Sequence, residues 1–238
     1  MMSFNSIYEA ALDRVGSRVA LHEMLPVSRS VNDLKSLSDA YCLSNMSRRI
    51  FQAGLNRRII DNKWPAFEGM FLLLQKCILT IQGDKVFHRF DIDAIRALSD
   101  EALEKLMEEK RIVRHWGKIQ SVRHNAQAIY ELNEEQESFV AYLADWPTDN
   151  IVGLWDVLKN RFKQLGGASG PYFLRRVKKD TFLLTQDVIK ALMRWGAIDE
   201  VPKNQRQKQQ VQVCMNEWHE ESQRSYCQIS MILAKSVD

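Results

Sequence analysis

The 238-residue chain is poor in glycine and proline, with ten and five, and it contains no long apolar run. The longest run, Met70–Leu74, ends at Gln75 and Lys76, far short of the ~20 residues that a membrane span needs. Acids occur within the first fifteen residues, and no basic segment there leads into an apolar one, so no signal peptide is recognisable. We therefore expect no membrane contact and a cytoplasmic location.

Cysteine is also scarce, and the four residues, Cys42, Cys77, Cys214 and Cys227, lie far apart without a C-x-x-C pair. This spacing argues against a zinc ribbon or a dithiol redox motif. The five histidines form no His-x-x-x-His pair, and no Gly-x-Ser-x-Gly element is present. We expect reduced, mostly buried thiols, no metal and no cofactor.

Apolar residues make up 45% of the chain and recur mostly at spacings of three and four, which predicts an all-α fold. Turn-forming residues are too few for a sandwich or barrel. Ser38, Ser99 and Thr185 are expected to cap helices, and Pro65 suits the first turn of a helix. Helices are expected over residues 4–15, 18–25, 39–54, 114–132 and 186–196, among others.

Residues 70–90 are dense in Leu, Ile and Val, and Gly83-Asp84 is their only turn signal. They either extend the preceding helix or form a small hairpin.

The formal net charge is only +3, but the basic residues are concentrated in three segments. Residues 48–63 sum to +4, residues 110–124 to +5 and residues 155–180 to +5, so the rest of the chain sums to −11. Each basic segment is either a solvated helix face or part of a surface that binds nucleic acid.

The third basic segment surrounds Lys163–Tyr172 (KQLGGASGPY), which contains three of the ten glycines between helix-compatible sequences. This pattern predicts a helix, a tight hairpin and a second helix. Backbone N–H groups at such a turn, flanked by Lys and Arg, bind phosphate without reading base sequence. Nucleic acid is therefore the leading partner.

Three further elements stand out: Met46–Leu55 (MSRRIFQAGL), Ile112–Ile119 (IVRHWGKI) with Asn125-Ala126, and Lys179–Phe182 (KDTF). Together with the hairpin they resemble the 3-methyladenine DNA glycosylase I group of the helix-hairpin-helix DNA glycosylases. The resemblance spans roughly residues 40–195. It implies an all-α, two-lobed fold in one unit over residues 1–238, with one lobe near residues 95–195 and the other from 1–94 and 196–238.

The resemblance also implies an activity. A monomeric DNA repair glycosylase would bind double-stranded DNA with a damaged base and hydrolyse the N-glycosidic bond of an alkylated base, which starts base excision repair. An enzyme that acts on a base must extrude it from the duplex and hold it against aromatic faces.

Site residues follow from the same resemblance. The hairpin residues Lys163, Gly166, Gly167, Ser169 and Gly170 would hold phosphate, with Lys118 and Lys179 supporting that grip. The base would lie among Arg49, Phe51, Trp64, Trp116 and Tyr172. Asp187, and less plausibly Asp180, would be the catalytic carboxylate; the alternative is that Asp187 only complements a helix N-terminus.

The chain departs from the family at two positions. Where the family has an acid that recognises the base and an aromatic residue, this chain has Arg49 and Arg57. A 3-methylated adenine is positively charged, so a guanidinium would disfavour it. Either these side chains turn toward phosphate, or the lesion differs, or excision has been lost. A non-enzymatic protein that binds damaged or bent DNA, and a helical interaction module, therefore remain as alternatives.

Overall fold

The computed structural model describes residues 2–79 and 90–237, without the side chains of residues 75–79. The chain forms helices joined by short loops, with no strand in these ranges, so the expected all-α class is confirmed for the described residues. Contacts divide it into two compact units, which are described separately. The expected lobe boundaries stay a prediction. No helix among the described residues is long and apolar enough to cross a membrane.

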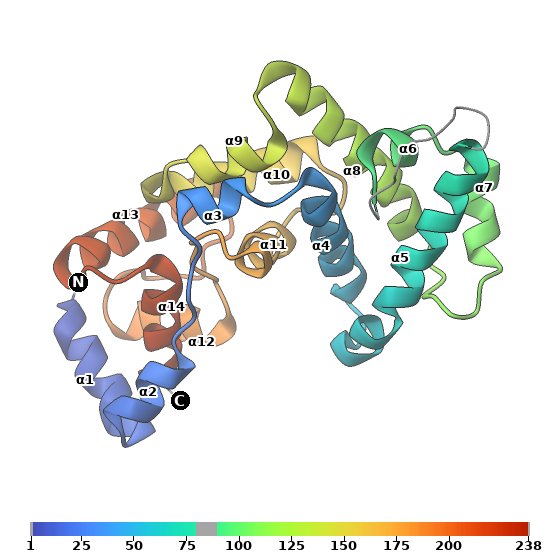
Figure 1. The fold of residues 1–238 in the computed structure, drawn as a ribbon. Helices are drawn as coiled ribbons and strands as arrows, with labels where there is room; N and C mark the ends of the chain where they lie inside the picture. Colours follow the sequence, from blue (N-terminus) through green and yellow to red (C-terminus); the bar gives the residue numbers. More distant parts are fainter. Residues whose placement is uncertain (1, 80–89, 238) are drawn as a thin grey trace. The chain divides into compact units, whose positions relative to one another are not determined.

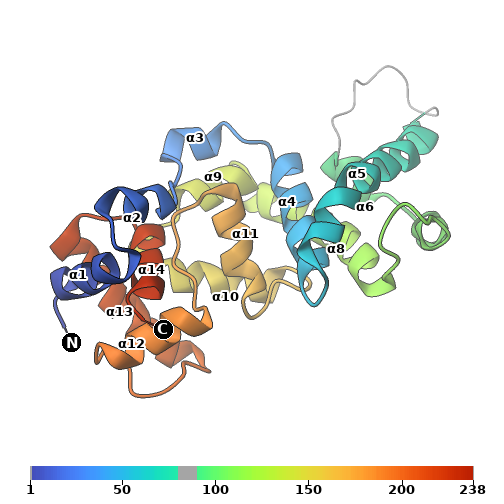
Figure 2. The same cartoon turned by 90° about the horizontal axis from the view of Figure 1, so that it is seen from below.

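The first unit consists of residues 1–30, 146–156 and 170–238. Its core gathers around α14, which packs against α1, α12 and α13, with Trp218 fully buried (Figures 1 and 2). The Glu221 carboxylate accepts a hydrogen bond from the Phe4 N–H and so caps α1 from α13. Its elements are α1 (Phe4–Val15), α2 (Arg18–Met24), η2 (Thr148–Asn150), α11 (Ser169–Val177), α12 (Gln186–Arg194), α13 (Gln205–Ser222) and α14 (Tyr226–Lys235).

The second unit consists of residues 31–145 and 157–169, and α10 (Ile151–Arg161) begins in the first unit and ends here. The long helix α8 packs against α4 and α6 (Figure 1). Other elements of this unit are α3 (Val31–Lys35), α4 (Asp39–Gln52), α5 (Arg57–Leu79), α6 (Ile92–Arg96), α7 (Asp100–Glu104), η1 (Lys105–Met107), α8 (Trp116–Glu135) and α9 (Phe139–Asp145).

Side-chain caps fix where several helices begin. Ser38, Ser99 and Thr185 each accept a hydrogen bond from the backbone N–H three residues later, as the sequence predicts. The expected start at Pro65 is wrong, because α5 begins at Arg57, where the Asn56 side chain accepts from the Arg58 N–H. Pro65 therefore lies inside the helix and cannot donate to the carbonyl four residues before it.

The ambiguous stretch 70–90 is resolved in part. Residues 70–79 continue α5, as one of the two alternatives expected. The other alternative, a small hairpin within residues 70–90, would involve residues 80–89, which lie outside the described residues.

Candidate nucleic-acid interface and base pocket

The glycine-rich segment connects α10 to α11, so the expected helix-hairpin-helix is present. Phe162 and Leu165 are buried and anchor the turn, whereas Lys163 and the tip residues Gly166 and Gly167 are exposed. Gly167 has a φ of +60°, a left-handed conformation that glycine adopts without strain. Ser169 and Gly170 open α11, and the Ser169 N–H donates to the Gly166 carbonyl.

The tip of the hairpin presents unused donors. Within the part of the chain that the structure describes, the N–H groups of Gly166 and Gly167 donate to no protein acceptor. Both residues are exposed, and the Lys163 ammonium is on the same turn. Two free N–H groups beside a cation form a site that suits a phosphate oxygen.

Helix α8 holds the base of the same hairpin. Asn125 has 0% exposure; its Oδ1 accepts from the Lys163 N–H at 2.7 Å, and its Nδ2 donates to the Lys163 carbonyl at 3.2 Å. Gln164 donates from Nε2 to the Gly117 carbonyl at 2.7 Å. Gln164 has a φ of 62°, unusual for a residue with a side chain.

Lys118 and Lys179 are placed differently from the hairpin lysine. They are 6% and 4% exposed, and each ammonium donates to backbone carbonyls: Lys118 to Phe51 and Ala53, and Lys179 to Trp146. Burial, followed by repulsion from Arg49, lowers the pKa of Lys118. Both lysines hold the protein's own main chain, so any support that they give to DNA binding is indirect.

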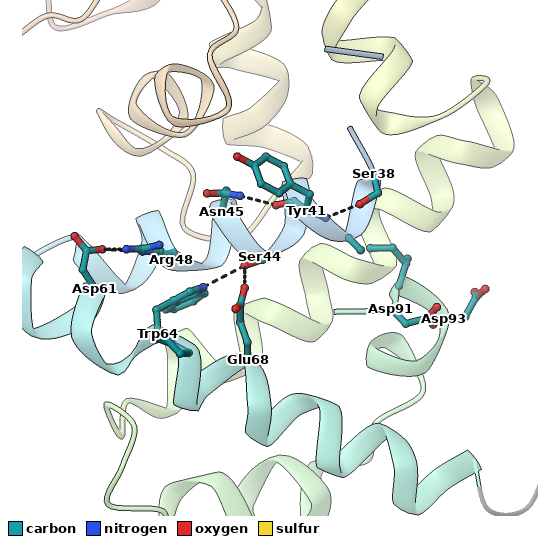
Figure 3. A pocket seen from close by; sticks show the side chains of 13 residues that line it. Ser38, Tyr41, Ser44, Asn45, Arg48, Asp61, Trp64, Glu68, Asp91 and Asp93 are labelled. Carbon is teal, nitrogen blue, oxygen red and sulfur yellow. Dashed lines mark hydrogen bonds and ion pairs between the residues drawn. The ribbon is translucent and has the colours of Figure 1, made fainter. Parts of the chain in front are cut away.

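A cavity of about 870 Å³ lies in the second unit, between α4, α5 and the start of α6 (Figure 3). Trp64 and Tyr41 provide aromatic surface, and Trp64 is the only expected base-contacting residue in this lining. Four carboxylates line the cavity against one guanidinium, that of Arg48. They belong to Asp61, Glu68, Asp91 and Asp93.

Two hydrogen-bonded groups order the cavity wall. Ser44 donates to a Glu68 carboxylate oxygen at 2.5 Å and accepts from the Trp64 indole N–H at 3.1 Å (Figure 3). Nearby, Arg48 Nε donates to Asp61 Oδ1 at 2.7 Å, and Gln52 donates to the same oxygen. Asp61 thus pairs with Arg48, and Glu68 accepts a hydrogen bond from the Ser44 hydroxyl.

The aromatic residues expected at the base site separate into core and surface positions. Phe51 is buried, and its ring centroid lies 4.7 Å from that of Phe67, which stacks on Trp64 at 4.7 Å. Phe51 therefore lies in the core and supports Trp64 through the Phe67 ring. Trp116 is half-buried in the first turn of α8, and Tyr172 is an exposed residue of α11 in the first unit.

The two arginines at the family's acid and aromatic positions do not line the cavity. Arg49 is half-buried on α4, near Lys118. Arg57 is exposed, with its Nε 3.7 Å from an Asp61 carboxylate oxygen. The position where the family has an acid therefore holds arginine in this chain. The carboxylates of the cavity come instead from α5 and the start of α6.

The two candidate catalytic acids differ in surroundings. Asp187 is exposed in the first turn of α12 and lines a groove of about 430 Å³ with Arg14 and Lys235. Asp180 accepts from the backbone N–H groups of Tyr226 and Cys227 and caps α14. Asp180 is therefore committed to the fold, and Asp187 is the accessible acid of the pair.

Comparison with known proteins shows a family match over part of the chain. Residues 73–160 match the sequence model described as Methyladenine glycosylase. The resemblance expected from the sequence is confirmed. The matched segment contains all of α8, with Lys118 and Asn125, and most of α10. DNA-3-methyladenine glycosylase 1 of Escherichia coli K12 is 37% identical over 57 residues, which are 24% of this chain and 30% of that protein. The chain thus covers under a third of that relative's length.

Similar solved structures include two DNA glycosylases. 3-Methyladenine DNA glycosylase I from Staphylococcus aureus is 19% identical and aligns over 68% of this chain and 86% of its own, with a TM-score of 0.49. The Methanocaldococcus jannaschii 8-oxoguanine glycosylase/lyase, solved with DNA containing 8-oxoguanine, is 14% identical and aligns over 96% of this chain and 95% of its own, also at 0.49.

Sequence reasoning missed Ser44 and Glu68. Asp61, Trp64 and Glu68 follow one another at spacings of three and four on α5, a pattern visible in the sequence. This helical spacing was not recognised because Pro65 suggested that a helix starts there, which would place Asp61 in a loop before the helix.

Proposed function

We propose that this protein is a DNA repair glycosylase that hydrolyses the N-glycosidic bond of an alkylated base of the 3-methyladenine type. One observation carries the proposal: a hairpin with free glycine N–H groups is anchored by the α8 residues that lie within the methyladenine glycosylase match. The partner is double-stranded DNA with a damaged base. A monomer in the cytoplasm is part of the same proposal.

The hairpin supplies the grip on DNA. Gly166 and Gly167 offer free N–H groups, Lys163 adds a charge, and Ser169 and Gly170 begin α11, whose N-terminus favours an anion. Phosphate contacts of this kind position the protein without reading sequence. Lys118 and Lys179 contribute by fixing the main chain around α4 and Trp146.

The cavity in the second unit would take the extruded base. Trp64, backed by Phe51, provides an aromatic wall, and Glu68 provides a negative charge. An adenine alkylated at N3 is cationic, so a carboxylate in a partly enclosed site favours it. Contacts of Arg49, Trp116 and Tyr172 with the base belong to the proposal but not to this cavity.

Asp187 is the proposed catalytic carboxylate. As the bond from the sugar to the base lengthens, positive charge develops on the sugar, and a nearby carboxylate stabilises it. The base leaves with the bonding electrons, water adds to the sugar carbon and releases its proton to the solvent, and an abasic site remains. The exposed position of Asp187 on α12 makes it accessible to such a substrate.

Release of free base from methylated duplex DNA tests the proposal. The wild type should liberate 3-methyladenine, Asp187→Asn should lower the rate at least a hundredfold, and Glu68→Gln should lower it about tenfold, or ~1.4 kcal/mol. Glu104→Gln, on the exposed side of α7, is the matched control. No release by the wild type from a broad panel of alkylated substrates would overturn the glycosylase assignment.

A second function is favoured by Arg49, which stands where the family has an acid. A non-enzymatic helix-hairpin-helix protein would bind damaged or bent DNA with a steep dependence on salt and release no base. Binding without release would establish this alternative. Unchanged DNA affinity after Lys159→Glu and Lys163→Glu together would instead indicate a helical interaction module, since both lysines are exposed beside the hairpin.

A further inference from the structure

The main chain of the hairpin is held by a side chain that lies 38 residues away. The buried Asn125 amide accepts from the N–H and donates to the carbonyl of a single residue, Lys163. Asparagine has one acceptor and one donor group at this reach, whereas aspartate lacks the donor. A residue held by both of its backbone groups cannot rotate about its backbone dihedrals without breaking one of the two bonds.

The side chain of Lys163, whose backbone Asn125 holds, is exposed to solvent. Lys163 is exposed, although Phe162 and Leu165 in the same turn are only 3% and 1% exposed. Asn125 fixes the backbone of Lys163, so the side chain leaves the turn from a defined position in the same segment as Gly166 and Gly167. Such pre-organisation reduces the entropy lost when a ligand is bound.

A second bond acts on the next residue. Gln164 donates to the Gly117 carbonyl in the first turn of α8, while its own backbone is in the left-handed region at a φ of 62°. A non-glycine residue pays for that conformation unless its surroundings hold it there. The Gln164 side-chain bond, here called the strap, and the two Asn125 bonds therefore fix the consecutive residues Lys163 and Gln164, one residue before the glycine tip.

We propose that Asn125 is a positioning residue for DNA binding, which sets the hairpin in the conformation that receives phosphate, and that Gln164 reinforces it. The inference rests on the proposed function only in taking DNA as the ligand. It adds a role for a residue that touches neither phosphate nor base. Its failure is separable from that of the glycosylase assignment, because binding and base release are measured independently.

The experiment measures affinity for an undamaged duplex at several salt concentrations. Asn125→Asp keeps the acceptor and removes the donor, and Gln164→Ala removes the strap at an exposed position where folding should survive. Both variants should bind at least fivefold more weakly. The slope of log affinity against log salt should fall by about one, the contribution of a single phosphate contact.

A matched control separates positioning from general stability. Ser121 is buried on the same helix, and its hydroxyl donates only to the Lys118 carbonyl, so Ser121→Ala should leave the salt slope unchanged. For base release, the Asn125→Asp loss should appear in KM, with kcat within about twofold of the wild type.

Three results decide the matter. Folded Asn125→Asp and Gln164→Ala variants with wild-type affinity and slope would overturn the proposal, even if base release is normal. Should Asn125→Asp fail to fold, the Gln164→Ala slope decides alone. The wild type could also bind DNA but release no base, while both variants lose affinity as expected. That result would leave the positioning role intact and remove only the glycosylase assignment.

Discussion

The ammonium of Lys118 lies 2.6 Å from the carbonyl oxygen of Ala53, the C-cap residue of α4. Helix C-termini leave carbonyls without intrahelical donors, and a cation is the favoured partner there. Replacing the lysine with methionine keeps the apolar stem and removes this donor. We predict that Lys118→Met lowers the free energy of unfolding by about 2 kcal/mol, the usual value for a charged hydrogen bond.

Urea denaturation measures this loss, and Lys105→Met, at an exposed position, provides the control. The control should unfold within about 0.5 kcal/mol of the wild type. Equal stabilities for both variants would mean that Lys118 does not cap α4.

The glycine at the hairpin tip gives a second prediction. Gly167 has a φ of +60° and open space where a side chain would go, so strain rather than collision decides the effect of a substitution. Gly167→Val should force the turn out of the left-handed region, whereas Gly167→Asn should be tolerated, because asparagine adopts that region more readily.

Fluorescence anisotropy with duplex DNA checks the pair. The valine variant should bind about tenfold more weakly, and the asparagine variant within about threefold of the wild type. Equal weakening by both would indicate that the bulk of the side chain, and not the backbone conformation, matters at the tip.

Features that depend on neighbouring residues could be predicted from the sequence. The caps at Ser38, Ser99 and Thr185 are local because the hydroxyl and the N–H that it accepts from lie three residues apart. The hairpin was equally predictable, since its glycines mark the turn between two helices. Pro65 misled because a proline is most common in a first turn, yet packing of Trp64 and Phe67 retains it inside α5.

Long-range pairing could not be predicted in the same way. Each basic segment was expected to be a solvated helix face or part of a surface that binds nucleic acid, but several of their charges pair with acids of the same chain. Arg48 pairs with Asp61, Arg123 with Asp100 and Arg161 with Glu135. The distribution of charge along the chain does not show which acidic side chain pairs with which basic side chain in the fold. The surface that we propose for DNA is thus narrower than the charge pattern of the sequence, and the exposed Lys163 is part of it.

One substitution separates the two roles considered for Asp187, which are stabilising the N-terminus of α12 and acting as the catalytic carboxylate. If it only complements the N-terminus of α12, then Asp187→Asn costs about 0.5 kcal/mol of stability and leaves base release near the wild-type rate. If Asp187 is the catalytic carboxylate, the same change lowers the rate of release at least a hundredfold while leaving DNA affinity within about twofold. Asp13→Asn, at an exposed position of α1, is the control for charge alone.

The last prediction concerns stability at high pH. Tyr226 is buried, and its hydroxyl donates to Asn216 Oδ1 at 2.9 Å. Burial, with Asp149 as the next cause, raises the pKa of Tyr226 from its ordinary value of 10 to about 12. The folded protein therefore keeps the phenolic proton after the unfolded chain has lost it.

The stability contributed by that proton is complete below pH 10 and is lost as the pH rises through about 12, because only the unfolded state gains from ionising in this range. Tyr226→Phe lacks the titrating group, and Asn216 Oδ1 still accepts from Gln212. The variant should be about 1 kcal/mol less stable than the wild type at pH 8. From pH 10 upward the wild type should lose stability relative to the variant by up to about 2 to 3 kcal/mol, so that its advantage disappears and then reverses. Parallel pH profiles for the two proteins would show that Tyr226 ionises equally in both states.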